Sequence, residues 1–447
     1  MPGPLTKRLQ TAPPWAFNLF AILAAFSTYA CMYAFRKPFT AATFDEPGPD
    51  GVPFQPQLAG VDYKIWLVAA QLVGYMLSKF IGIRVVSEMT AARRAWTIFL
   101  LIAVAEAALL GFALIPSPYN IPFMFLNGLP LGMVWGLVFS YLEGRRYTDL
   151  LGAGLCTSFI VSSGIVKSVG SLLMQGGVGQ FWMPFITGLL FLPLLMLALF
   201  LLNQLPPPSP AEVASQSARE PMTRTSRRKL FQKLSIGLVL LVVLYTLLTA
   251  LRDFRDNFMA DILKEMNENA PENFTLIELI VSVGVLAVLG GLVLVRNNFR
   301  ALMINHLMIG LGVLLTGLST LLYHWQSIAG TTWLVGIGLG IYMAYVPFNA
   351  FLFDRLLATF KYVGTASFLI MVADAFGYLG STGVMFYKNF AYPDLQWTSF
   401  LMNAAYVLTF IGLGFTGGAM VYFWQKRKNR AGPLAPLPEE STGGDAS

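Results

Sequence analysis

Apolar runs of about 20 residues or more recur along the whole chain, separated by shorter polar segments. A helix needs about 20 apolar residues to cross the hydrocarbon core of a bilayer, so each run predicts a membrane-spanning helix. We place twelve such helices near residues 15–42, 62–86, 94–115, 120–142, 150–174, 181–203, 234–262, 274–296, 301–323, 331–354, 361–388 and 397–425. The pattern therefore predicts an all-α membrane protein with twelve transmembrane helices.

The basic residues between these runs favour one side of the membrane. They gather at the N-terminus, in every second loop, in the middle connection and in the sequence KRKNR (426–430), and include Lys7, Arg8, Arg84, Arg93, Arg94, Arg145, Arg146, Arg219, Arg224, Arg227, Arg228, Lys229, Lys233, Arg296, Arg300, Arg355 and Lys361. The opposite loops are short, or acidic as in FDEPGPDG (44–51) and KEMNENAPEN (264–273). By the positive-inside rule, we expect both termini in the cytoplasm and the protein in the inner (cell) membrane.

One polar segment divides the chain into two halves. Residues 205–233 are rich in Pro, Ser and Arg and have no apolar period, which predicts a cytoplasmic linker. We therefore expect six-helix bundles over 1–204 and 234–426, followed by a cytoplasmic and disordered tail over 427–447.

The two halves also resemble each other. The fourth helix carries Gly128 and Gly132, the tenth carries Gly336 and Gly340, and this spacing lets helix backbones approach closely in lipid. The fifth helix reads SFIVSSGIVKSVGS and the eleventh reads SFLIMVADAFGYLGS. Two such halves in the same orientation are the plan of the major facilitator superfamily, in which substrate binds at the midplane between the halves. We expect a monomer.

Composition excludes several other classes of protein. Of 447 residues, 56% are hydrophobic and 12% are charged, and the mean hydropathy is +0.63. The net charge of +7 comes from the loops that set topology, so no nucleic-acid partner is expected. Two cysteines in apolar runs (Cys31 and Cys156) and two isolated histidines (His306 and His324) predict neither a metal site nor a cofactor. The sequence contains no GxxxxGK[ST] motif, so ATP-driven transport is not expected. It also contains no acid–base constellation, so an enzyme is not expected.

Charged residues inside apolar runs are the candidates for function, because each costs about 2.5–3.5 kcal/mol to place in a bilayer by insertion scales. Two stretches carry them on one helical stripe, with spacing i, i+4, i+7: Tyr29, Tyr33 and Arg36 in the first, and Tyr245, Thr249 and Arg252 in the second. Arginine with lysine and tyrosine hydroxyls suits a phosphate or a carboxylate. The two stripes therefore predict the two poles of an anion site.

A helix-flank interpretation competes with this one. Arg36 and Lys37 could lie at the membrane surface and extend their side chains to water. The recurrence of the stripe at Arg252, and the apolar sequence that continues beyond Pro38, argue against it. Lys37 lies off the stripe, so Arg36 is predicted to face the cavity and Lys37 is a secondary candidate.

Further charges lie on other helices. Lys79 has Tyr75 one turn before it, and snorkelling to the cytoplasmic end is its alternative. Lys167 lies near the middle of the fifth helix, where Asp374 at a corresponding depth is its expected partner, in a structural ion pair or in a site that binds ligand. The remaining acidic candidates, for charge pairing or proton coupling, are Asp253, Asp256 and Glu278.

The sequences YxxxYxxRKxF, GYxxSKFxG and FLNGLPLGMVWG resemble the first, second and fourth helices of the organophosphate:phosphate antiporter family, part of the major facilitator superfamily. The resemblance implies that Arg36 and Arg252 clamp a phosphate. It further implies site roles for Tyr29, Tyr33, Tyr75, Lys79 and Tyr245. Thr249 replaces a second tyrosine of that family, and Ser163 aligns near a family histidine.

These observations predict a secondary transporter that moves a small anionic solute, phosphorylated or carboxylated, across the inner membrane by alternating access. The alternative is a membrane sensor that keeps the site and signals without transport. Apart from that solute and membrane lipid, no partner is expected.

Overall fold

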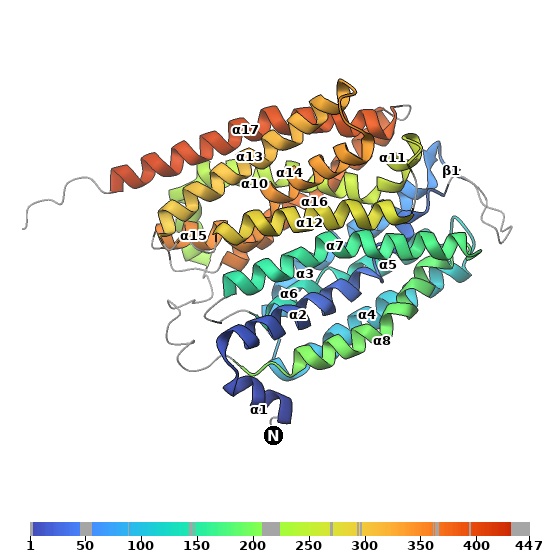
Figure 1. Cartoon of the computed structure of the whole chain (residues 1–447), viewed down its shortest axis with the longest axis horizontal. Coiled ribbons are helices and arrows are strands. Elements are labelled where there is room, and N and C mark those ends of the chain that lie inside the picture. Colours follow the sequence, from blue (N-terminus) through green and yellow to red (C-terminus); the bar gives the residue numbers. More distant parts are fainter. Residues whose placement is uncertain are drawn as a thin grey trace, which may run out of the picture.

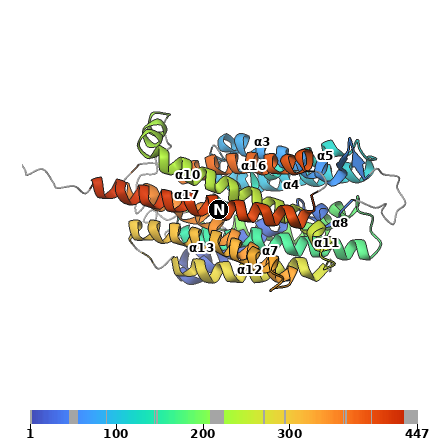
Figure 2. The same cartoon turned by 90° about the horizontal axis from the view of Figure 1, so that it is seen from above.

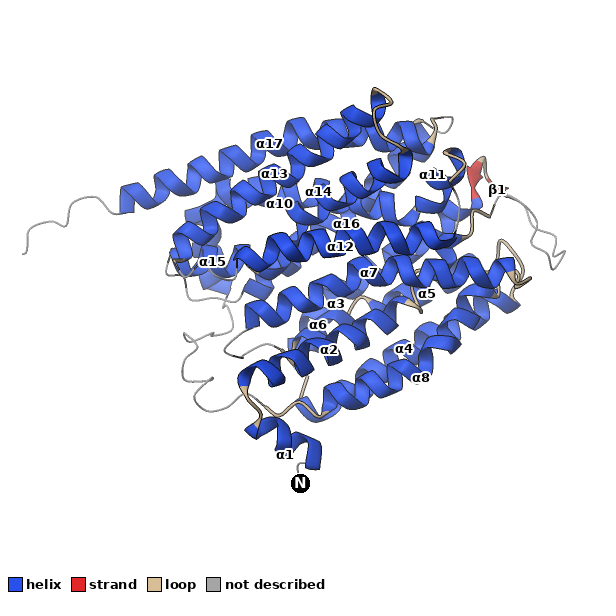
Figure 3. Cartoon of the chain, viewed as in Figure 1, coloured by secondary structure: helices blue, strands red, loops and turns tan. Residues whose placement is uncertain are grey.

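The computed structural model describes residues 3–44, 56–87, 89–142, 145, 148–207, 224–268, 271–292, 295, 297–360, 362, 366–392 and 395–430. Almost all of them are helical (Figure 3). The long helices are α2 (Pro14–Tyr33), α3 (Tyr63–Ser87), α4 (Ala91–Leu114), α5 (Ile121–Leu131) with α6 (Val134–Phe139), α7 (Thr148–Gln175), α8 (Met183–Asn203), α10 (Arg224–Asn257), α12 (Pro271–Leu292), α13 (Asn298–His324), α14 (Gly330–Ala350), α16 (Ala366–Ala391) and α17 (Trp397–Arg430). The predicted twelve spans are confirmed: within the described residues, twelve helical segments are long and apolar enough to cross a membrane.

Shorter elements connect these spans. They are α1 (Pro4–Thr11), the 3₁₀ helix η1 (Pro38–Ala41), the strands β1 (Gln57–Leu58) and β2 (Val61–Asp62), α11 (Met259–Glu265) and α15 (Leu352–Thr359). The two strands form an antiparallel pair in the register Gln57↔Asp62. The hairpin and α11 lie at the same end of the molecule (Figure 1).

The helices form two bundles with the same internal arrangement. In the first half α2 packs on α7 and α8, α4 packs on α5 and α8, and α3 packs on α5; the equivalent helices of the second half make the equivalent pairs, with α10 on α16 and α17, α13 on α14 and α17, and α12 on α14. In Figure 1 the second half (yellow to red) fills the upper part and the first half (blue to green) the lower part. Matching pairs in both halves confirm the predicted pseudo-symmetry.

Two helix pairs join the bundles. α7 packs against α12, and α3 packs against α16. These pairs lie on opposite faces of the molecule (Figure 2). The space between them is bordered by α2 from one half and α10 from the other, the helices that carry the two tyrosine–arginine stripes.

The small residues predicted to mediate close packing do so. A Cβ atom on Gly128 would lie 2.2 Å from the carbonyl oxygen of Gln71 on α3. A Cβ atom on Gly340 would lie 2.6 Å from the carbonyl oxygen of Gly312 on α13. Only glycine therefore lets α5 and α14 approach their neighbours this closely, although the close neighbour is α3 in the first half and α13, the equivalent of α4, in the second.

Several predicted boundaries differ from the structure. α10 begins at Arg224, within the predicted linker, and has a break at Leu234, where φ is −122° and ψ is 17°. α17 continues to Arg430, four residues into the predicted tail. The remainder of the linker (208–223), the rest of the tail (431–447), most of the acidic segment 44–51, and the basic residues Arg146, Arg219, Arg296 and Lys361 lie outside the described residues.

Candidate functional site

The first helix ends before its arginine, which corrects the prediction of one continuous helix over 15–42. α2 ends at Tyr33, and tighter turns lead through Arg36 to η1. Pro38 has no N–H group to continue the helical hydrogen bonds. The carbonyl oxygens freed at Phe35 and Arg36 accept hydrogen bonds of 2.9 Å from the side-chain amides of Asn127 and Gln71. Irregular backbone inside a membrane requires such internal partners.

Arg36 is buried, with 4% of its surface exposed. Its guanidinium carbon lies 3.7 Å from the centre of the Tyr75 ring, and Tyr75 in turn packs on Tyr378 of α16, with ring centres 4.9 Å apart. Among the described residues no carboxylate lies within 4 Å of this guanidinium, and its Nε atom makes no hydrogen bond. Arg36 is thus a buried cation held by an aromatic face in place of a counter-ion.

Lys37 and Lys167 share one carboxylate. The Nζ atoms of both lie 2.5 Å from an oxygen of Asp256, near the C-terminal end of α10. Ser163 on α7 donates a hydrogen bond to the same carboxylate, and Lys37 donates another, of 2.7 Å, to Asn257. Since Lys37 and Lys167 belong to the first half and Asp256 to the second, this cluster ties the bundles together.

The expected pairing of Lys167 with Asp374 is therefore wrong. Asp374 on α16 instead lies 3.1 Å from Lys79 of α3 and accepts a hydrogen bond from the hydroxyl of Tyr245. The residues lie at similar depths, but α7 packs on α12 and α16 packs on α3, on opposite faces of the molecule (Figure 2). Equal depth in two spans does not make their helices neighbours.

The second stripe has its own acidic partners. Arg252 lies 2.7 Å from the Asp253 carboxylate, and its guanidinium carbon lies 4.2 Å from the centre of the Tyr345 ring. Arg255 is fully buried and lies 2.7 Å from Glu278 of α12. Asp253 thus neutralises Arg252, as its position in the sequence allowed, and Glu278 of α12 neutralises Arg255.

The remaining residues of the stripes lie around the same centre. Tyr29 packs edge to face on Tyr33, with ring centres 5.6 Å apart. The Tyr245 hydroxyl lies 2.8 Å from that of Tyr345. Thr249 turns its hydroxyl to the carbonyl of Tyr245 within α10, so it contributes no free donor to the centre.

A small cavity of about 10 Å³ joins the two poles. The residues that line it come from both halves and are Tyr33, Arg36, Lys37, Phe159, Arg252, Asp253, Asp256 and Tyr342. This volume is about the room that one water molecule needs. Lys37 lines the cavity as well as Arg36, so the prediction that placed Arg36 alone at the cavity was too narrow. The other predicted site residues do not line it: Tyr29, Tyr75, Lys79, Ser163, Lys167, Tyr245, Glu278 and Asp374.

Some residues of this interface were not singled out by sequence reasoning. Lys64 donates to Asp261 of α11 over 2.6 Å and to the carbonyl of Thr40 over 3.0 Å, which makes another ionic contact between the halves. Both residues stand at the ends of predicted spans and look like ordinary flanking charges. Phe159 and Tyr342 line the cavity, but aromatic residues are too common in this chain to carry a signal.

These features define a class: a multi-pass membrane protein with two six-helix bundles around a charged central cavity. Similar solved structures include a D-xylose-proton symporter, with a TM-score of 0.61 at 13% identity over 92% of this chain and 97% of that one. They also include the nucleoside transporter NupG, with a TM-score of 0.54 at 14% identity over 92% and 99%. The fold is that of the major facilitator superfamily.

The chain belongs to a family of unknown function, DUF5690, whose model matches residues 38–426. A comparison with curated proteins found no match. The matched segment begins just after Arg36 and Lys37 and includes Lys79, Lys167 and the charged end of α10.

Proposed function

We propose that this protein is a secondary transporter that moves a small solute bearing a phosphate or carboxylate group through the central cavity by alternating access. The observation that carries the proposal is Arg36. A buried guanidinium without a carboxylate partner is unfavourable in a membrane protein unless a ligand or another group compensates it. A planar guanidinium donates two parallel hydrogen bonds to phosphate or carboxylate oxygens.

The charges around the cavity support an anion as the substrate. Among the described residues, six cationic side chains lie in and around the central cavity against four carboxylates, so two positive charges are in excess there: Arg36, Lys37, Lys79, Lys167, Arg252 and Arg255 against Asp253, Asp256, Glu278 and Asp374. A solute with two negative charges would balance this excess, and a solute with one would halve it. A neutral solute would leave it uncompensated.

The ion pairs between the bundles suggest how the substrate and the conformational change are coupled. Asp256 binds Lys37 and Lys167 across the interface, and Asp374 binds Lys79. An anion that enters beside Arg36 competes with Asp256 for Lys37 and so weakens one contact that holds the bundles together. Rocking of the two halves about the site would then expose it to the other side.

The small size of the cavity fits this scheme. About 10 Å³ holds no sugar phosphate or dicarboxylate, so the bundles are closed around the site and must separate for a solute to enter. The similar solved structures are those of a symporter and a nucleoside transporter, which supports transport. Location in the inner membrane with cytoplasmic termini, and relation to the organophosphate:phosphate antiporters, remain predictions from the sequence.

The test is uptake into proteoliposomes that contain the purified protein, screened with labelled phosphate, sugar phosphates and small dicarboxylates. We expect saturable uptake of one of these anions, which Arg36→Lys abolishes because an ammonium group cannot replace the two-pronged donor. Arg300→Lys makes the same chemical change at an exposed position of α13 and should leave uptake unchanged.

Two results would overturn the proposal, one its transport activity and the other its anion site. Saturable binding of an anion without flux would identify the protein as a sensor. Uptake of neutral solutes alone, unaffected by Arg36→Lys, would reject the anion site.

A further inference from the structure

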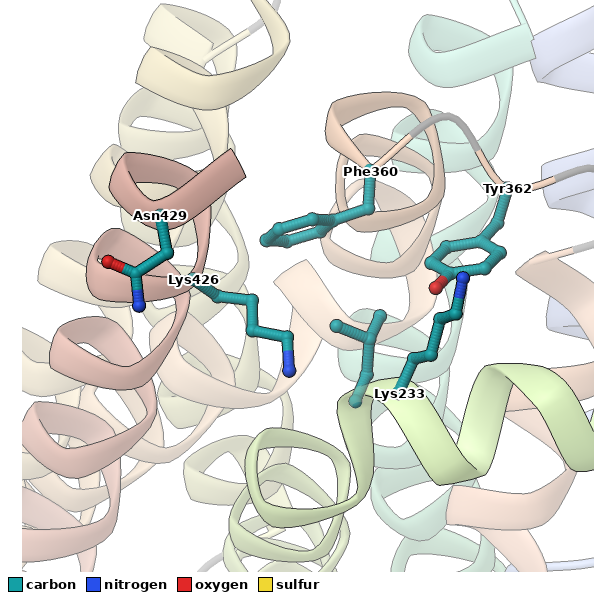
Figure 4. A pocket seen from close by; sticks show the side chains of 6 residues that line it. Lys233, Phe360, Tyr362, Lys426 and Asn429 are labelled. Atoms are coloured by element: carbon teal, nitrogen blue, oxygen red, sulfur yellow. The ribbon is translucent and has the colours of Figure 1, made fainter. Parts of the chain in front are cut away.

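A second cavity, remote from the first, lies beside the break in α10 (Figure 4). Its volume is about 260 Å³, and it lies between α10, the end of α17 and the segment that follows α15. The residues that line it are Lys233, Leu234, Phe360, Tyr362, Lys426 and Asn429. It is far larger than the central cavity and can hold a phosphate group together with part of the molecule that bears it.

The break in α10 positions one of the two lysines. Helical geometry is lost at Leu234, whose side chain is buried. The carbonyl oxygen of Lys233 accepts a hydrogen bond of 3.2 Å from the hydroxyl of Tyr422 on α17. This contact fixes α10 against α17 at the break, so that Lys233 and Lys426 both border the space shown in Figure 4.

Among the described residues, the charges that line the cavity are all positive. No acidic side chain lines it, and neither Lys233 nor Lys426 forms an ion pair with any described residue. The Lys233 Nζ atom lies 6.0 Å from the centre of the Tyr362 ring, and the Lys426 Nζ atom lies 5.7 Å from that of Tyr422. The cavity thus offers two ammonium groups with free donors and the side-chain amide of Asn429, above an apolar floor of Leu234 and Phe360. Such a lining suits an anion attached to an apolar group.

The depth of the cavity restricts the source of that anion. It lies where two apolar spans end, since the α10 span starts at Leu230 and the α17 span finishes at Asn429. This is the level of lipid headgroups. Anionic lipids are attracted to basic residues at this depth, by about 1 kcal/mol per lysine or arginine.

We propose that the cavity at Lys233 and Lys426 binds a phosphate group, either as the headgroup of an anionic phospholipid or as a free phosphate. The site is separate from the transport cavity, and its occupancy does not depend on the proposed transport function. The cavity lies at the break of α10, so a bound headgroup would hold α10 and α17 together. The other end of α10 carries Arg252 and Asp256.

The experiment measures binding to the purified full-length protein in a neutral detergent. The probes are short-chain phosphatidylglycerol, short-chain phosphatidylcholine and inorganic phosphate, each titrated by calorimetry. We expect saturable binding of phosphatidylglycerol that weakens about 30-fold in the double variant Lys233→Gln/Lys426→Gln, from about fivefold for each lysine.

The control is Arg228→Gln/Lys428→Gln, which removes the same net charge from exposed positions of the same two helices that do not line the cavity. It should bind as the unmodified protein does. If Lys233→Gln/Lys426→Gln loses affinity for phosphatidylglycerol alone, the cavity is a lipid site. If it loses affinity for inorganic phosphate to the same extent, the cavity is a free-phosphate site. The proposal is overturned if neither probe binds saturably, if phosphatidylcholine binds equally well, or if both double variants lose the same affinity.

Discussion

The ends of α2 and α10 carry the same tyrosine–arginine stripe but place their arginines in opposite electrostatic settings. On α2 the helix ends at Tyr33, and Arg36 lies in a turn against the ring of Tyr75 without a carboxylate partner. On α10 the helix continues to Asn257, and Arg252 lies against the carboxylate of the next residue, Asp253. The fold therefore repeats the positions and varies the charges.

This difference assigns unequal roles to the two poles. Arg36 is available to an incoming anion, whereas Arg252 is already neutralised and binds a solute only in competition with Asp253. Asp256 also belongs to α10, but it neutralises two lysines of the other half. In the mechanism that we propose, one pole recruits the anion, and the other couples its arrival to the contacts between the bundles.

The largest effect on stability should follow removal of the shared carboxylate. Asp256→Asn leaves Lys37 and Lys167 buried without a counter-ion, and breaking such a buried pair costs about 3–5 kcal/mol. Thermal unfolding can be followed with a thiol-reactive dye, because both cysteines are buried in the folded protein. We expect a marked fall in the unfolding temperature. Asp62→Asn, at a partly exposed residue of β2, should show none, and equal stability of the two variants would contradict the assigned role of Asp256.

A smaller effect should follow from Asp253→Asn, which we expect to strengthen the binding of the anion. This change frees Arg252 and raises the positive excess of the cavity by one charge. We expect affinity for the transported anion to rise about tenfold, which corresponds to about 1.4 kcal/mol. Equilibrium binding of that anion measures it. Weaker binding would mean that Asp253 positions Arg252 for the substrate and does not compete with it.

The smallest effect on stability should come from the pair between α3 and α16. Lys79 and Asp374 keep 13% and 10% of their side-chain surface exposed and form a single ion pair, whereas Asp256 binds two lysines, so we expect a smaller coupling of about 1–2 kcal/mol. A double-mutant cycle with Lys79→Gln and Asp374→Asn, read by the same dye, should give a coupling of that size. A coupling as large as the cost of Asp256→Asn would remove the distinction between the two interbundle contacts.

The architecture was accessible from the sequence because it depends on local properties. The length and composition of each apolar run determine whether it can span a membrane, and the Gly128 and Gly340 spacings mark where backbones approach. The charged residues of the site could be found too, since Arg36, Lys167 and Arg252 are costly in lipid wherever they lie.

The contacts of those residues could not be predicted in the same way. The end of α2 depends on Gln71 and Asn127, which bind the freed carbonyls from other helices. The partner of Lys167 depends on which helices are neighbours, a property of the folded bundle that depth along a span does not encode. Lys64 and Asp261 resembled flanking charges until the fold brought them together.

The most direct test of the central claim compares anion binding by Arg36→Lys and Arg252→Lys. Both keep the charge and remove the planar donor. For the anion selected by the uptake screen, the unequal poles predict that Arg36→Lys weakens equilibrium binding at least about 30-fold, from the 2–5 kcal/mol typical of a buried hydrogen-bonded charge, and that Arg252→Lys weakens it less. Unchanged binding by Arg36→Lys, in a protein that unfolds at the unmodified temperature, would contradict the account.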